Sequence, residues 1–110
     1  MLVKQEIVEI NKEFDKGNVV NESSLDFALS SIKQTKDWIK QLAYLVRAIL
    51  IDHVFEEGNK RTAAVLIMVF IEENKLDYDP QKVDQIVIDI LKKNITDIKK
   101  IRRLIKNAIK

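Results

Sequence analysis

The segment Ala63–Ile71 constrains the fold most, because every residue in it is apolar. A helix that is apolar on all sides must be covered on all sides by its neighbours. Most other apolar residues of the 110-residue chain recur at spacings of three and four, which is the helical period. Evidence for strands is weak. We therefore predict an all-α fold, a single-domain six-helix bundle over residues 1–110 with this segment in its buried central helix.

Capping chemistry places the ends of these helices. Asn, Ser, Thr and Asp side chains can accept hydrogen bonds from the first free N–H groups of a helix. Glycine can take the left-handed conformation that ends one, and Pro80 fits a first turn capped by Asp79. Val19 and Val20 are predicted to form a short extended piece. The first two helices are predicted from about Val3 to Phe14 and from Asn21–Ser23 through Ile32. The third is predicted from a Thr35 cap through Val54, with Gly58 as the stop, and the fourth from Asn59 or Lys60 to about Asn74. The fifth is predicted from Pro80 to Asn94, and the last begins after a Thr96 cap.

The composition excludes several classes of protein. With 46% hydrophobic and 33% charged residues, the chain does not resemble a disordered one. It has no cysteine, which excludes disulfides and thiolate metal sites. The start, Met1–Glu6, does not resemble a signal peptide, and the uncharged run Thr62–Ile71 is far shorter than the roughly 20 residues that span a bilayer. We predict a cytoplasmic protein without a membrane partner.

Basic residues gather in the segment Thr96–Lys110, although the net charge of the chain is only +2. Such a tail can attract nucleic acid or an acidic partner. The simpler interpretation is the solvated face of a terminal helix, and we favour it over nucleic-acid binding. A non-catalytic binding module that uses this helix remains an alternative function from a different class. The apolar stripe beneath the charges comprises Ile98, Ile101, Leu104, Ile105 and Ile109.

A polar segment, His53–Thr62, interrupts two apolar runs and contains the only histidine of the chain. The first N–H groups of the helix that follows have no partners within the helix, and its dipole adds partial positive charge. An anion such as phosphate can bind there. Gly58 allows the backbone to approach a ligand closely, while Lys60 and Arg61 add full charges. The segment therefore predicts a phosphate-binding turn.

Two further residues suggest chemistry on the phosphorylated ligand. A carboxylate beside a phosphate requires a cation between them, which makes Glu57 the candidate ligand for Mg²⁺, with Glu56 second. His53 is the candidate general base, because imidazole changes charge near neutral pH. Phe55 is predicted to anchor the loop in the core. Each of these residues alone has a structural explanation, such as a histidine at a helix end or an ordinary helix stop. Their occurrence together in one short segment favours a functional site.

The pattern His53-x-Phe55-x-Glu57-Gly58-Asn59-Lys60-Arg61-Thr62 resembles the signature of the Fic/Doc family. That signature reads His-Pro-Phe-x-Asp/Glu-Gly-Asn-Gly-Arg-x-x-Arg, and the chain departs from it at Val54, Lys60 and Ala64. The run of residues 59–63, Asn-Lys-Arg-Thr-Ala, is similar to the Doc (death-on-curing) toxin branch. Residues 21–29 also resemble the Leu-x-x-Ala-Leu helix of that branch.

This resemblance implies a helical enzyme that modifies a hydroxyl of a target protein with part of a nucleotide. His53 would be the base, Glu57 would hold Mg²⁺, and Arg61 would stabilise the transferred phosphate. Gly58, Asn59 and Lys60 would bind phosphate. Lys60 and the missing second Arg at Ala64 go with transfer of the γ-phosphoryl group of ATP, with elongation factor Tu as the target class. The Doc branch often has Ala where Gly58 stands, so AMP transfer (AMPylation) remains the alternative.

Regulation is also implied by the resemblance. AMP-transferring relatives are often silenced by a helix that reads Ser/Thr-x-x-x-Glu-Gly/Asn. The pair Glu73-Asn74 has Val69 at the hydroxyl position, so this string is not present. Control would then come from an antitoxin in trans, with residues 23–32 as a candidate contact. A degenerate member that binds nucleotide without turnover is a third possibility.

Overall fold

The computed structural model describes residues 4–110 and contains six α-helices in that range. No strand forms among these residues, although two isolated β-bridges do. The predicted start of the first helix at Val3 falls outside the described residues. Within residues 4–110 no helix has the length and apolar character needed to cross a bilayer. The helices are α1 (Lys4–Lys12), α2 (Glu22–Ile32), α3 (Trp38–Leu50), α4 (Asn59–Glu73), α5 (Pro80–Lys92) and α6 (Ile98–Asn107).

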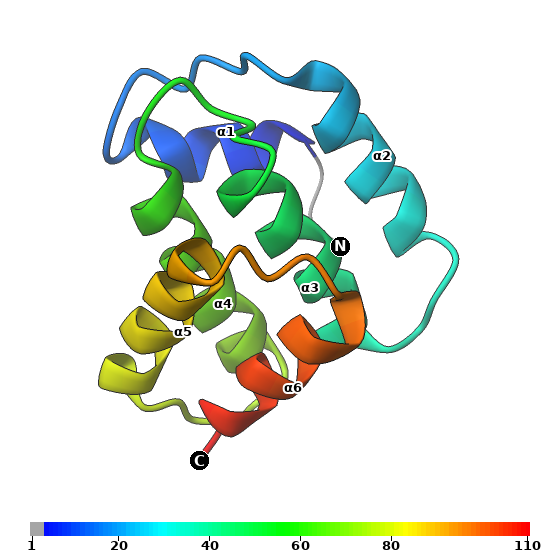
Figure 1. The fold of residues 1–110 in the computed structure, drawn as a ribbon, viewed down its shortest axis with the longest axis vertical. Coiled ribbons are helices and arrows are strands. Elements are labelled where there is room, and N and C mark those ends of the chain that lie inside the picture. Colours follow the sequence, from blue (N-terminus) through cyan, green and yellow to red (C-terminus); the bar gives the residue numbers. More distant parts are fainter. Residues whose placement is uncertain (1–3) are drawn as a thin grey trace.

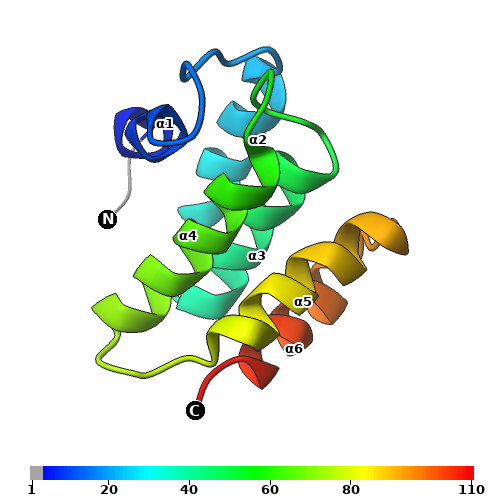
Figure 2. The ribbon, with the colours of Figure 1, turned by 90° about the vertical axis from the view of Figure 1, so that its left-hand side faces the viewer.

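Two neighbouring helices, α3 and α4, share the centre of the molecule (Figure 1). The apolar helix α4 contacts α1, α3 and α5, which cover it as predicted (Figure 2). The neighbouring helix α3 is also largely buried, because it packs against α2, α4, α5 and α6. The predicted all-α, six-helix fold with a buried central helix is confirmed, and α3 lies beside that helix. The fully buried residues of α3 include Leu42, Leu45, Val46, Ile49 and Leu50.

Two predicted N-caps are wrong by one or two residues. Asp37, not Thr35, caps α3 through hydrogen bonds from the N–H groups of Ile39 and Lys40. Asp97, not Thr96, caps α6 through the N–H of Lys99. In each case an aspartate lies just downstream of a threonine, and the aspartate takes the cap. The predicted caps Asn21 and Asp79 are confirmed for α2 and α5.

The largest correction concerns the end of α3. The helix stops at Leu50 and does not continue through Val54. Gly58 therefore does not end α3, and instead stands at the N-cap position of α4. The chain leaves α3 early because Val54 and Phe55 are buried in the core, where Phe55 forms an antiparallel bridge with Val19. The predicted extended piece at Val19 is confirmed, and it supports the loop between α3 and α4.

The C-terminal helix α6 is amphipathic as predicted. Ile101 and Ile105 are fully buried, and the other members of the predicted stripe are half-buried against the core. Most of its basic side chains point into solvent. One of them, Arg102, instead bonds the α3 cap Asp37 through its Nε atom at 2.6 Å. The ion pair ties α6 to the N-terminal end of α3.

Asp37 makes the fold sensitive to acid. Partial burial opposes ionisation of this carboxyl and raises its pKa. The hydrogen bond and charge of Arg102, together with the N–H groups of Lys40 and Ile39, favour the ionised form more strongly. The pKa of Asp37 therefore lies below its ordinary value. A carboxyl with a lowered pKa stabilises the fold above the pKa of the unfolded chain, and this contribution is lost as the pH falls through the folded value.

We expect Asp37→Asn to lower the free energy of unfolding at pH 7 by at most about 1 kcal/mol, because asparagine still caps a helix but cannot pair with Arg102. The difference from wild type should shrink at an acid pH below the ordinary carboxyl pKa of 3.8, and it should vanish once the folded carboxyl is protonated. Urea unfolding followed by circular dichroism at both pH values measures it. Asp79→Asn, at a cap without an ion pair among residues 4–110, is the matched control. Equal losses for both variants would contradict the role of the ion pair.

Candidate functional site

The loop between α3 and α4, residues 51–58, is anchored by its two buried residues. Val54 is fully buried and Phe55 is 1% exposed. The N–H groups of Val20 and Asn21 both donate to the Val54 carbonyl, which fastens the loop to the segment before α2. Because the two anchors point inward, the flanking side chains of His53, Glu56 and Glu57 are exposed. The predicted inward orientation of Phe55 is confirmed.

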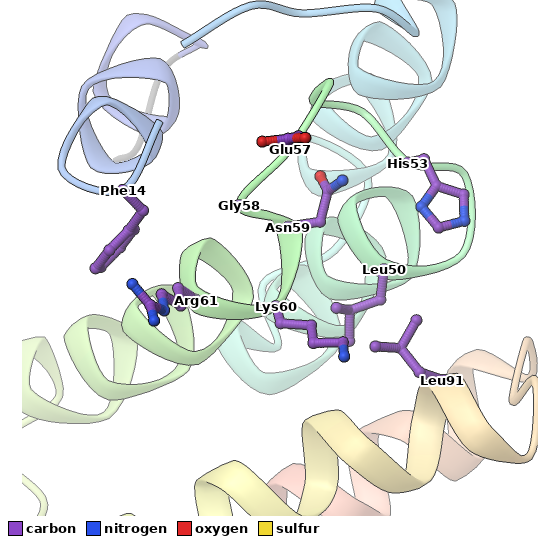
Figure 3. Close-up of a pocket in the computed structure, with 9 residues that line it drawn as sticks. All are labelled: Phe14, Leu50, His53, Glu57, Gly58, Asn59, Lys60, Arg61 and Leu91. Atoms are coloured by element: carbon purple, nitrogen blue, oxygen red, sulfur yellow. The ribbon is translucent and has the colours of Figure 1, made fainter. Parts of the chain in front are cut away.

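The backbone of His53 lies in the left-handed region, with φ = 49°. This conformation is uncommon for a residue with a Cβ, and it costs of order 1–3 kcal/mol. It directs the chain away from the axis of α3 immediately after that helix ends. The imidazole consequently stands at the rim of a pocket and not on a helix face (Figure 3).

The turn at Gly58 presents free backbone N–H groups. Gly58 has φ = 76° and provides no side-chain cap for α4. Within residues 4–110, the N–H groups of Gly58, Asn59, Lys60 and Arg61 donate to no protein acceptor. A Cβ at position 58 would lie 3.0 Å from Nδ2 of Asn11, so the turn is also packed tightly from behind. This is the geometry of an anion-binding helix start.

The side chain of Asn59 closes the loop and does not point at a ligand. Its Oδ1 accepts from the N–H of Phe55 at 3.1 Å, and its Nδ2 donates to the Phe55 carbonyl at 2.9 Å. Asn59 can therefore contribute to phosphate binding only through its backbone. The sequence prediction placed the residue correctly but did not distinguish these two roles.

A pocket of about 490 Å³ gathers the predicted site residues except Glu56, the second candidate for metal binding (Figure 3). His53 and Glu57 come from the loop, and the other polar lining residues come from the start of α4. The opposite walls are supplied by distant parts of the chain, which the sequence analysis did not assign to the site. The complete lining is Phe14, Leu50, His53, Glu57, Gly58, Asn59, Lys60, Arg61 and Leu91.

The two adjacent carboxylates of the loop differ in their partners. Glu56 accepts a hydrogen bond from Nδ2 of Asn18 at 3.1 Å and does not line the pocket. Glu57 lines the pocket, and its carboxylate has no hydrogen-bond partner among residues 4–110. Within the same residues, no three His, Asp or Glu side chains cluster closely enough to hold a metal. A single carboxylate could hold a cation such as Mg²⁺ only together with oxygen atoms of a ligand.

Two cations stand on the α4 side of the pocket. The Arg61 guanidinium lies over the ring of Phe14, 5.9 Å from its centroid, a cation–π contact that leaves its N–H groups available. The Lys60 chain extends toward Leu91 (Figure 3). Neither cation forms an ion pair with another described residue. Their charge is therefore available to an anionic ligand.

The pocket continues into a second space beyond Lys60. This space, about 330 Å³, is lined by Lys60, Ile88, Leu91 and Lys92. Lys60 and Leu91 belong to both linings, so the two spaces adjoin. Ile88 is 48% exposed, which leaves an apolar surface at the outer end. A ligand with an anionic end and an apolar end matches this arrangement.

Sequence reasoning missed the residues that reach the site from other helices. Phe14 was predicted to end the first helix, yet it lies beyond the end of α1, half-buried beneath Arg61. Leu50 and Leu91 fall within predicted helices and were not assigned to the site. No local pattern marks such residues, because their role depends on long-range packing.

Comparison with known proteins gives one match. The model of the Fic/DOC family matches residues 5–71, which is more than half of the chain. The matched segment runs from α1 to α4 and contains the polar residues of the pocket, whereas Leu91 lies outside it. No match to the chain is found among curated proteins or among solved structures.

Proposed function

Because the chain belongs to the Fic/DOC family, we propose that it transfers the γ-phosphoryl group of ATP to a hydroxyl of a target protein. The family consists in general of protein-modifying transferases that use nucleotides. One observation carries the proposal: a single pocket combines an imidazole, a carboxylate, two unpaired cations and a helix start with free N–H groups. These are the groups that phosphoryl transfer requires for positioning and for charge neutralisation.

In the proposed reaction, the oxygen of the target hydroxyl attacks the γ-phosphorus of ATP, and ADP leaves. His53 accepts the hydroxyl proton, a role its exposed position at the rim of the pocket permits. The turn N–H groups from Gly58 onward and the guanidinium of Arg61 bind the phosphate oxygens as their charge changes. Mg²⁺ bound by Glu57 together with phosphate oxygens would neutralise further negative charge.

Two features support phosphoryl transfer over AMP transfer. The terminal phosphate of ATP has the most negative charge, and the turn, Lys60 and Arg61 concentrate positive charge at one end of the pocket. Ala64, where the AMP-transferring pattern has its second Arg, is buried in the core. The chain therefore lacks the second arginine that goes with AMP transfer in the family pattern. A translation elongation factor is the proposed target class, and an antitoxin in trans is the proposed regulator.

Labelled ATP tests the proposal directly. We expect the purified protein, incubated in a cell extract with Mg²⁺, to label a target protein from γ-labelled ATP and not from α-labelled ATP. Label from the α position alone would establish AMP transfer and contradict our choice between the two reactions. If the protein binds nucleotide but no target protein in the extract is labelled from either form of ATP, the result would contradict an enzymatic role and indicate a nucleotide-binding module.

A further inference from the structure

A fully buried polar residue, Asn11 of α1, lies directly behind the phosphate-binding turn. Its Nδ2 donates to the Glu57 carbonyl at 2.9 Å and to Oγ1 of Thr62 at 3.1 Å. Its Oδ1 accepts from the N–H of Gly17 at 2.9 Å. The side chain thus uses both of its N–H donors and one acceptor site of its oxygen, and it joins α1 to the loop and to α4.

Asn11 belongs to a set of side chains that hold the loop carbonyls away from the pocket. Nδ2 of Asn59 binds the Phe55 carbonyl, and the Thr62 hydroxyl binds the Gly58 carbonyl at 2.8 Å. Asn11 does the same for Glu57. In a planar trans peptide unit, the C=O of one residue and the N–H of the next point in opposite directions. A Glu57 carbonyl held inward therefore turns the N–H of Gly58 toward the pocket.

From this geometry we infer that Asn11 is a positioning residue of the phosphate-binding turn. It does not touch the ligand, and it acts by fixing the peptide unit between Glu57 and Gly58. Without its amide, the Glu57 carbonyl loses its donor, and a rotated carbonyl oxygen would face the phosphate and repel it. The inference rests on the proposed function in one respect only, namely that the anion bound at the turn is a phosphate.

The test compares Asn11→Leu with wild type by ¹⁵N NMR. Leucine fills nearly the same volume but has neither donor nor acceptor. Residual dipolar couplings report the orientation of the Gly58 N–H, and titration with inorganic pyrophosphate and Mg²⁺ reports affinity. We expect the Gly58 coupling to change and the affinity to fall by about tenfold, the worth of a charge-assisted hydrogen bond. If the leucine variant does not fold, Asn11→Asp is used in its place. Aspartate keeps an oxygen that can accept from the Gly17 N–H and lacks the two N–H donors of asparagine.

Asn74→Leu is the matched control at the other end of α4. It removes one bond of the same type, from Nδ2 of the exposed Asn74 to the Phe70 carbonyl at 2.8 Å, and should leave both measurements unchanged. An Asn11 variant that folds and keeps wild-type coupling and affinity would overturn the inference. If the Asn11 variant changes the Gly58 coupling but wild type does not bind pyrophosphate, the result would support the positioning of the turn and contradict the proposed function.

Discussion

Replacing His53 by alanine should lower the rate of transfer by about 10²–10⁴-fold, the usual contribution of a general base. The chain has no second histidine that could take over. Binding of ATP should change little, because the turn N–H groups and the two cations remain. Single-turnover labelling at saturating ATP measures the chemical step, and a titration with unlabelled nucleotide measures binding. Wild-type rates in the alanine variant would exclude His53 as the base.

The control for His53→Ala must account for the backbone. His53 has φ = 49°, so alanine at this position must also adopt the left-handed conformation. The control substitution therefore needs the same backbone conformation. Lys75→Ala provides the match, because Lys75 also has a positive φ of 62° and follows the opposite end of α4. We expect both variants to unfold at similar temperatures and only His53→Ala to lose transfer. A parallel loss of activity in the two would indicate destabilisation.

Replacing Arg61 by alanine should lower turnover by about 10²–10³-fold, because a preorganised cation at the transferred phosphate is lost. Arg61→Lys should recover part of the rate, since lysine keeps the charge but cannot form two parallel hydrogen bonds. Initial rates over a range of ATP concentrations separate kcat from KM. A change confined to KM would show that Arg61 binds ATP without stabilising the transition state.

Arg47→Ala is the matched control for Arg61→Ala. Arg47 likewise places its guanidinium over an aromatic ring, 5.5 Å from the centroid of Tyr44, but it lies on α3 and does not line the pocket. It should lose some stability and no turnover. If both arginine variants lost activity equally, the effect of Arg61 would be attributed to packing.

The number and order of the helices could be predicted from the sequence, because apolar periodicity and caps are local properties. The ends were less certain where two capping residues lie close together. Aspartate ranks above threonine as an N-cap, so local chemistry alone could have assigned the caps to Asp37 and Asp97. The early end of α3 instead depends on the contact of Phe55 with Val19. Such long-range partners leave no trace in the local pattern.

The same distinction applies to the candidate site. Its polar residues could be predicted because they occupy one short segment, and the fold brings that whole segment to one pocket. Asn11 could not be predicted, because an asparagine inside a helix ordinarily faces solvent, and here the full burial depends on contact between α1 and α4. Phe14 was not assigned to the site, because its contact with Arg61 likewise depends on how the fold brings the two residues together.

The wall that faces the reactive residues has a separate origin in the chain. Leu91 and Ile88 belong to α5, beyond the segment shared with the family, whereas the residues proposed for chemistry all lie inside it. Substitutions in α5 can therefore reshape the space for the uncharged part of a co-substrate while the charged machinery stays intact. Exchange of these aliphatic side chains would thus change which uncharged group the pocket accepts, and it would leave the proposed phosphate contacts in place.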